Sequence, residues 1–250
     1  MTGGYEDSAP FLARVALYAH QRDPVDLPGV ALEALAGVTG SVVDVGCGPG
    51  IYVQRITVER PDLRVVAMDL SRGMRPTVVG DAVRLPYADD AFDAGLAMHM
   101  LYHASDIPAA ISQLRRVVRP GGVVVVSTNA QGDKAEVADL WDDVLGELAP
   151  GPHLPFVAPT AVFDAELAEP LLAAAFDDVR VQRFERPVVV PDYDTVIAAL
   201  DSYRAFHEPA LPDGVSWATY LAAVRRHVGA TMAREGAFTL NTRFAVLTCR

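Results

Sequence analysis

Short runs of consecutive apolar residues alternate with amphipathic stretches through the first half of the chain. Such runs are typical of strands buried on both faces in a parallel sheet. We predict five of them, at residues 42–45, 64–69, 77–81, 92–98 and 123–128. Apolar residues at helical spacing predict helices at 51–60 and 107–118. Because strands that alternate with helices form right-handed parallel crossovers, this half of the chain predicts a doubly wound sheet.

The periodicity changes on both sides of this region. Before it, residues 10–20 have helical spacing after Ser8, which we expect to cap the helix, and residues 28–36 predict a second short helix. After it, we predict helices at 134–149, 164–175, 193–206 and 216–234, a strand that alternates at 179–190 and a terminal strand at 242–250. The fold class is therefore α/β. We expect a Rossmann-like, mostly parallel seven-stranded sheet with an antiparallel last strand and helical cap insertions.

Composition and charge exclude several classes of protein. Apolar residues make up 51% of the 250 residues and charged residues 21%, as in a soluble globular protein, and no apolar stretch reaches the ~18 residues of a membrane helix. The net charge of −11 argues against a nucleic-acid binder, which needs clustered lysine and arginine. Cys47 and Cys249 have no metal-ligand spacing, and the first residues do not resemble a signal peptide. We expect a cytoplasmic protein with no membrane or nucleic-acid partner.

The sequence VVDVGCGPG, residues 42–50, places a glycine-rich turn between the first strand and its helix. A phosphate loop is excluded because no lysine is near, and the dinucleotide pattern G-x-G-x-x-G fails at Ile51. Asp44 precedes the first glycine, where it would repel a phosphate and attract an amine. A carboxylate, free backbone amides and a helix N-terminus together suit a zwitterionic amino-acid group.

Two further aspartates follow the next two strands. Asp69 ends the second strand, where a carboxylate can accept hydrogen bonds from both hydroxyls of a ribose. Asp81 follows the third strand, where the amino group of an adenine could donate to it. Taken singly, each could be an ordinary cap or turn residue. Together with Asp44 they indicate a nucleoside that carries an amino-acid group, such as S-adenosylmethionine.

In these motifs the chain resembles the class I S-adenosylmethionine-dependent methyltransferases, of the small-molecule group that includes the ubiquinone and menaquinone methylases. The resemblance covers about residues 40–130, in the order VVDVGCGPG, VVAMDLSRGM, GDAVRLPYADDAFD, FDAGLAMHMLYHASD and LRRVVRPGGVVVVS. It departs from the family between the second and third strands, where Pro76 leaves room for little more than a turn. We expect one methyltransferase domain over 1–250, with lid helices in 1–36 and an acceptor pocket formed by the insertions at 131–178 and 191–236.

The resemblance implies particular cofactor contacts. The loop glycines would approach the methionine moiety, Asp44 its amine, Asp69 the ribose, and Asp81 with the Ala82 amide the adenine edge. The implied cofactor-binding residues are Asp44, Gly46, Cys47, Gly48, Gly50, Asp69, Leu70, Met74, Asp81, Ala82, Met98 and His99. The cofactor would be S-adenosylmethionine, with S-adenosylhomocysteine as its product.

Catalytic residues are harder to identify, because the protein mainly orients the acceptor and needs a base only if the acceptor must lose a proton. The candidates are His103, His99 and Tyr18. The two histidines could equally pack against the cofactor or cap a helix, and they lack a third ligand for a metal. The predicted substrate pocket is lined by Tyr18, His20, Tyr102, His103, Trp141, Tyr203, Phe206 and His207, with Trp217 as a further candidate.

The predicted reaction is methyl transfer to an oxygen, nitrogen or carbon atom of a small molecule. Nucleic-acid base methylases carry an Asn/Asp-Pro-Pro-aromatic motif where this chain reads AMHMLYH. A single lysine, Lys134, is typical of a GC-rich genome and, with a variable cap, favours natural product biosynthesis. As an alternative, the same fold could bind the cofactor for a cyclisation, or bind it without any reaction. A nicotinamide-dependent reductase is disfavoured by Ile51 and Asp44. The oligomeric state stays open.

Overall fold

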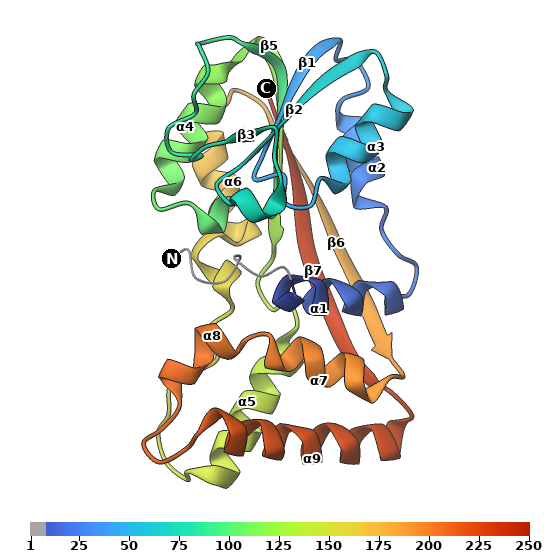
Figure 1. Ribbon diagram of the computed structural model, residues 1–250, viewed down its shortest axis with the longest axis vertical. Coiled ribbons are helices and arrows are strands. Elements are labelled where there is room, and N and C mark those ends of the chain that lie inside the picture. The colour runs from blue at the N-terminus through green and yellow to red at the C-terminus, as the bar shows by residue number, and fades with distance from the viewer. Residues whose placement is uncertain (1–8) are drawn as a thin grey trace.

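Seven strands form one sheet in the order β3-β2-β1-β4-β5-β7-β6 (Figure 1). The computed structural model describes residues 9–250, so the predicted cap at Ser8 lies outside the described residues. The strands are β1 (Gly40–Val45), β2 (Leu63–Asp69), β3 (Val78–Val79), β4 (Phe92–Met98), β5 (Val118–Asn129), β6 (Val179–Val190) and β7 (Phe238–Cys249). Strands β1 to β5 pair in parallel, and β7 is antiparallel to both β5 and β6. The predicted fold class is confirmed.

Helices cover both faces of the sheet and also form a separate layer beyond its end. They are α1 (Ala9–Ala16), α2 (Leu27–Ala34), α3 (Ile51–Glu59), α4 (Ile107–Val117), α5 (Ala135–Leu148), α6 (Ala165–Ala173), α7 (Tyr193–Asp201), α8 (Arg204–His207) and α9 (Trp217–Glu235). One buried cluster joins the sheet to α4 and α6, and another joins the opposite face to α2 and α3. None of the helices within residues 9–250 is long and apolar enough to cross a bilayer.

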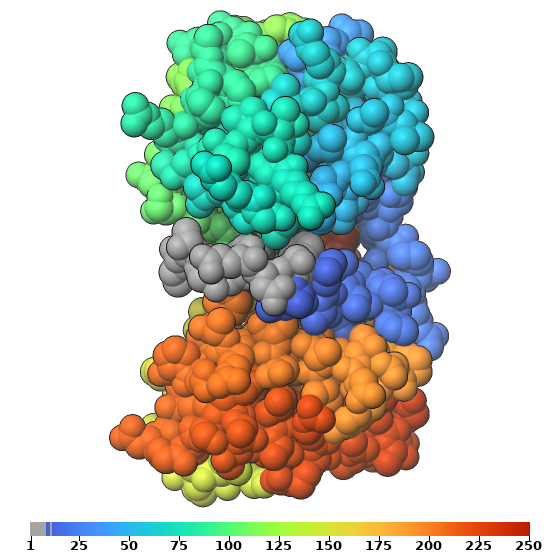
Figure 2. All heavy atoms as spheres, in the orientation of Figure 1, coloured from blue at the N-terminus to red at the C-terminus, as the bar shows by residue number. Residues whose placement is uncertain are grey.

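The helices beyond the sheet have a core of their own, in which α5, α7 and α9 pack together. Strands β6 and β7 connect this layer to the sheet. They pair with each other over twelve residues each, whereas β7 pairs with β5 only from Phe244 onward. The remaining part of the two strands extends as a ribbon away from the sheet. Figure 2 shows the result as two lobes, with α1 crossing between them.

Several elements differ in their bounds from the sequence prediction, and for two of them the reason is visible in the structure. The single helix predicted at 193–206 is broken between α7 and α8. There the Ser202 hydroxyl donates to the Ala199 carbonyl at 2.5 Å, while the Ser202 carbonyl accepts from Arg14 Nη1 at 3.2 Å. Strand β7 begins at Phe238 rather than at residue 242, because its pairing with β6 continues into the ribbon. The turn expected in place of a helix between β2 and β3 is present as a short 3-10 turn, Arg72–Met74.

Candidate functional site

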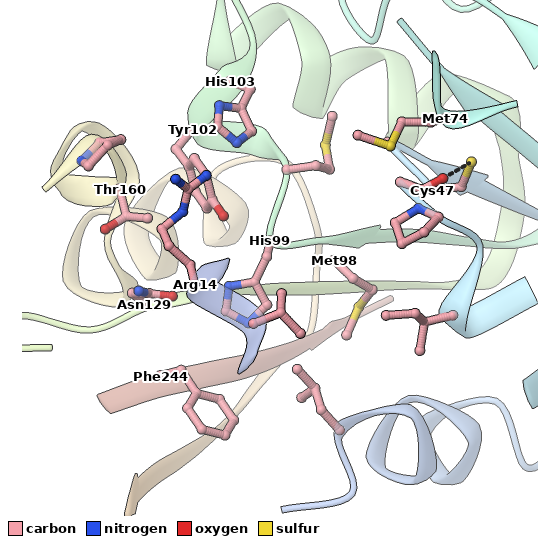
Figure 3. A pocket seen from close by; sticks show the side chains of 18 of the residues that line it. Arg14, Cys47, Met74, Met98, His99, Tyr102, His103, Asn129, Thr160 and Phe244 are labelled. Carbon is pink, nitrogen blue, oxygen red and sulfur yellow. Dashed lines mark hydrogen bonds between the residues drawn. The ribbon is translucent and has the colours of Figure 1, made fainter. Parts of the chain in front are cut away.

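A cavity of about 960 Å³ opens at the carboxyl ends of β1, β2, β4 and β5 and continues under the cap helices. The strand order reverses at β1, which lies between β2 and β4, and ligands of doubly wound sheets bind in the crevice at this point. Figure 3 shows Cys47 and Met74 at one end of the cavity, with Arg14, Tyr102 and Thr160 at the other. The cavity therefore joins the glycine loop to the region beneath the cap.

The glycine loop between β1 and α3 needs its glycines for conformation. Gly46, Gly48 and Gly50 have φ angles of +68°, +53° and +82°, which side chains disfavour. A Cβ at Gly46 would also lie 2.6 Å from the Cβ of Met100. Gly50 precedes α3 and supplies no side-chain cap, so the first amides of this helix are open to an anion at the cavity wall.

Asp44 is a buried carboxylate at the end of β1, with 1% of its surface exposed. Neither carboxylate oxygen has a hydrogen-bond partner within the described part of the chain. Burial, and then the nearby charge of Asp69, raises the pKa of Asp44 to about 8. A buried carboxylate without a donor is costly. A cationic donor such as an ammonium group would remove that cost, so the residues present fit the amino-acid group expected here.

Asp69 links the ends of the first two strands. One carboxylate oxygen accepts from the Gly48 amide at 2.9 Å, and the other accepts from the Ser71 amide at 2.8 Å. Each oxygen of a carboxylate has two acceptor positions, so both can still accept a hydroxyl from the cavity. The side chain thus shapes the loop and presents a bidentate acceptor.

Most of the other predicted cofactor residues also line the cavity. The residues of the predicted set that line it are Gly46, Cys47, Gly48, Asp69, Leu70, Met74, Asp81, Ala82, Met98 and His99. Asp44 and Gly50 do not line it, but each is next in sequence to a residue that does. Leu70 is 54% exposed although it is apolar, so it presents a hydrophobic surface at the mouth. Burial, followed by Asp44 and Asp69, raises the pKa of Cys47 to about 12, so its thiol stays protonated.

His99 follows β4 and begins a polar network in the cavity wall. It has a left-handed backbone with φ +51°, and its amide donates to both the carbonyl and the hydroxyl of Ser127 at 3.0 Å. Burial lowers the pKa of its ring to about 4, although a side-chain hydrogen bond with Asn129 and the charge of Asp133 oppose that shift. Its imidazole is therefore neutral at pH 7.

The network continues from Asn129 into a buried ion pair. The Asn129 amide and the Lys134 ammonium both donate to the same oxygen of Asp133, each at 2.5 Å. The other oxygen of Asp133 accepts from the Arg243 amide at 2.8 Å. Lys134 also lies 5.5 Å from the centre of the Tyr18 ring. The network thus connects the end of β4 to the beginning of α5.

His103 and Tyr102 lie in a short 3-10 turn after β4, with ring centres 4.4 Å apart. Both line the cavity. Desolvation, and then the charge of Arg14, lowers the pKa of His103, although the residue as a whole is exposed. Figure 3 shows Arg14 extending from α1 toward this pair.

Of the residues predicted in the substrate pocket, Tyr18, Tyr102, His103, Tyr203 and Phe206 line the cavity. His20, Trp141, His207 and Trp217 do not, which corrects their predicted placement. Trp141 has no exposed surface and donates to the Leu154 carbonyl at 2.9 Å. His207 is 3% exposed, stacks on Phe156 with ring centres 4.1 Å apart, and contacts two backbone carbonyls.

These residues lie outside the cavity because the helices α5, α7 and α9 have a separate core of their own. Trp141 and Trp217 lie on faces of α5 and α9 that bury one another, and Trp217 donates to Asp201 at 2.6 Å. His20 ends the 3-10 turn after α1, Leu17–His20, outside the cavity lining. The cavity is also lined by residues that were not predicted, namely Arg14, Asn129, Asp133, Lys134 and Thr160. A cue for three of them was available, since Asn129, Asp133 and Lys134 follow the carboxyl end of a predicted parallel strand.

Residues 43–126 match a family model described as a methyltransferase domain. The malonyl-[acyl-carrier protein] O-methyltransferase of Serratia marcescens is 35% identical over 151 residues, which cover 55% of this chain and 58% of that protein. The demethylmenaquinone methyltransferase of Mycolicibacterium paratuberculosis is 35% identical over 109 residues, which cover 40% of this chain and 47% of that protein. The chain spans about half the length of the curated relatives it matches.

A solved structure from Anabaena variabilis, described as a candidate methyltransferase of an antibiotic pathway, has the same fold. It superimposes with a TM-score of 0.59 and 16% identity, covering 88% of this chain and 95% of that one. The motifs in the matched segment are those that surround the cavity, from the glycine loop to β5. Residues 43–126 therefore match a methyltransferase domain, and the chain is similar to the methyltransferases named above.

Proposed function

We propose that the protein transfers the methyl group of S-adenosylmethionine to an oxygen, nitrogen or carbon atom of a small molecule. The observation that carries this proposal is Asp44, a buried carboxylate to which none of the described residues donates, together with the uncapped first turn of α3. This pair suits the ammonium and carboxylate of an amino acid. Asp69 and Asp81 line the same end of the cavity and suit the ribose hydroxyls and the adenine edge.

When bound, the cofactor supplies an activated methyl group; the residues of the chain hold the two reactants. In this proposal Asp44 and the α3 amides bind the amino-acid end, and Asp69 accepts from the ribose. The cavity volume of about 960 Å³ is at the upper end of the ~300–1,000 Å³ typical of small-molecule sites, so it leaves room for an acceptor. We propose that the lid helices of residues 1–36 and the insertions at 131–178 and 191–236 form the acceptor part.

The histidines in this site are weak bases. Burial lowers the pKa of both His99 and His103, and that of His99 to about 4. Each ring can accept a proton at pH 7, but with little driving force. We therefore propose that the reaction depends mainly on positioning, with His103, His99 and Tyr18 in contact with the acceptor or the cofactor. The setting we propose is a cytoplasmic step of natural product biosynthesis.

Calorimetric titration tests the cofactor, and product release tests the reaction. We expect S-adenosylmethionine and S-adenosylhomocysteine to bind and NAD(H) not to bind. With a panel of small acceptors, S-adenosylhomocysteine should be released in proportion to methylated product. Binding of NAD(H) in place of S-adenosylmethionine would contradict the proposal. Tight cofactor binding with conversion of an acceptor but no S-adenosylhomocysteine would favour a cyclisation or another reaction without methyl transfer.

The stability of the free protein should depend on the protonation of Asp44. Its pKa is 3.8 ordinarily and about 8 in the folded state, so between these values the folded protein holds a proton that the unfolded chain has released. The free energy of unfolding should therefore fall as the pH rises through this window, by up to about 1.4 kcal/mol per pH unit. Urea unfolding at several pH values measures it, and Asp44→Asn should flatten this part of the profile.

Binding of the cofactor should release a proton from the same residue. At pH 7 the Asp44 carboxyl is mostly protonated, and an ammonium group beside it favours the charged form. Titration calorimetry in buffers of different ionisation enthalpy should show close to one proton released per S-adenosylmethionine bound at pH 7, and fewer at pH 9. Binding without any proton release at pH 7 would show that Asp44 does not meet the ammonium.

A further inference from the structure

The two ends of the cavity differ in charge. The end formed by the glycine loop carries the carboxylates of Asp69 and Asp81, with Asp44 buried behind them. The end beneath the cap carries Arg14 and Lys134, with Asp133 as its one lining carboxylate among the described residues. His99 and His103 are neutral at pH 7, because burial lowers the pKa of both. This end is therefore positive in a chain whose net charge is −11.

Lys134 does not account for that positive charge. Its ammonium lies 2.5 Å from Asp133, and both side chains are about nine-tenths buried, so the two charges cancel locally. Arg14 remains as the net charge. Its Nη1 donates to the carbonyl and the hydroxyl of Ser202, both at 3.2 Å, and its guanidinium lies 5.7 Å from the centre of the Tyr203 ring.

Arg14 has no carboxylate within ion-pair distance in the part of the chain that the structure describes. The backbone of Arg14 belongs to α1, which packs on α7. Ser202 binds one edge of the guanidinium group. Figure 3 shows the side chain extending toward Tyr102 and His103. A half-buried guanidinium held by two neutral acceptors is a preorganised site for an anion, and its planar fork matches a carboxylate.

The walls around Arg14 are aromatic. Rings of Tyr18, Tyr102, Phe156, Tyr203, Phe206 and Phe244 line this part of the cavity. Tyr203 and Phe156 meet edge to face with ring centres 5.5 Å apart. Such walls favour a flat apolar body over a strongly hydrated one. One unbalanced positive charge also favours a monoanion over a doubly charged phosphate.

We propose that the acceptor is a flat apolar molecule that carries a carboxylate, and that Arg14 binds this carboxylate. The inference rests on the proposed function, because it assigns the acceptor end by the position of the cofactor end. Arg14 thus has the role of recognising the acceptor, and this role is the same whichever atom of the acceptor receives the methyl group. The carboxylate of such an acceptor is already ionised when it enters the pocket. The weakly basic His99 and His103 therefore do not have to deprotonate it.

The test is the binding of matched acid and amide probes to the protein saturated with S-adenosylhomocysteine. The probes are 4-hydroxycinnamate, indole-3-acetate and hexanoate, each paired with its amide, in titration calorimetry. We expect at least one aromatic acid to bind roughly 10- to 100-fold more tightly than its amide, as for a charge-assisted hydrogen bond, and hexanoate to bind more weakly than the aromatic acids. Arg14→Gln should remove the preference for the acid, and Arg14→Lys should retain part of it.

Arg225→Gln is the matched control, because it makes the same change of charge at an exposed position on α9, outside the cavity lining. It should leave the preference for the acid unchanged. Equal binding of acid and amide by the unaltered protein, or an acid preference that survives Arg14→Gln, would overturn the proposal. Failure of S-adenosylhomocysteine to bind at all would instead overturn the proposed function. Retained cofactor affinity in Arg14→Gln would show that this variant is folded.

Discussion

Replacing Asp69 with alanine should weaken the binding of S-adenosylmethionine by about 100-fold or more. The carboxylate is the acceptor proposed for both ribose hydroxyls, and hydrogen bonds to a charged group contribute about 1.5–3 kcal/mol each. Loss of two such bonds corresponds to roughly 10²- to 10⁴-fold in affinity. The substitution also releases the Gly48 and Ser71 amides, which Asp69 holds at 2.9 and 2.8 Å, so the glycine loop loses a contact that shapes it.

Titration calorimetry with S-adenosylhomocysteine measures this effect without turnover. Asp69→Asn keeps one acceptor oxygen and should fall between the alanine variant and the unaltered protein. Asp143→Ala removes an exposed aspartate of α5 and should bind as the unaltered protein does. An unchanged affinity in Asp69→Ala would refute the assignment of this residue to the ribose. A melting temperature close to that of the unaltered protein would separate lost binding from a disordered loop.

The end of the cavity at the glycine loop could be predicted because it follows from chain order. Asp44, Asp69 and Asp81 lie at or just beyond the carboxyl ends of successive strands, and parallel strands bring these ends to one edge of the sheet. Residues at the ends of neighbouring predicted strands can therefore be expected to lie near one another in the folded protein. The glycine loop adds a conformational requirement that can be read directly, because three left-handed positions in five residues suit few residues other than glycine.

The end of the cavity at Arg14 could not be predicted in the same way. Arg14 is held by Ser202, 188 residues away in the sequence, and this contact depends on how α1 packs on α7. The link from His99 to Asn129 depends on the register of β4 and β5, in which Met98 pairs with Ser127. The prediction that Trp141 lines the pocket was wrong because helical spacing identifies the buried face of a helix but not the element that packs on it. Here the face of α5 meets α9.

Replacing Lys134 with methionine should lower the free energy of unfolding by about 3–5 kcal/mol, the cost typical of breaking a buried ion pair. Lys134 lies 2.5 Å from Asp133, and the two side chains are 10% and 9% exposed. Although burial opposes its charge, Tyr18 and Asp133 hold the pKa of Lys134 above its ordinary value. Methionine would leave Asp133 charged and buried, with only the Asn129 amide and the Arg243 amide as donors.

Urea unfolding and thermal melting measure this loss, which should appear as a fall of roughly 6–20 °C in Tm for a chain of this size. The double variant Asp133→Asn with Lys134→Met removes both charges and should recover a large part of the lost stability, since the cost comes from the unpaired carboxylate rather than from the missing amine. Arg225→Met makes the same loss of a positive charge at the surface and should stay within about 0.5 kcal/mol of the unaltered protein. If Lys134→Met cost less than about 1 kcal/mol, within the range of an exposed pair, Asp133 would have to be solvated or protonated in the folded state.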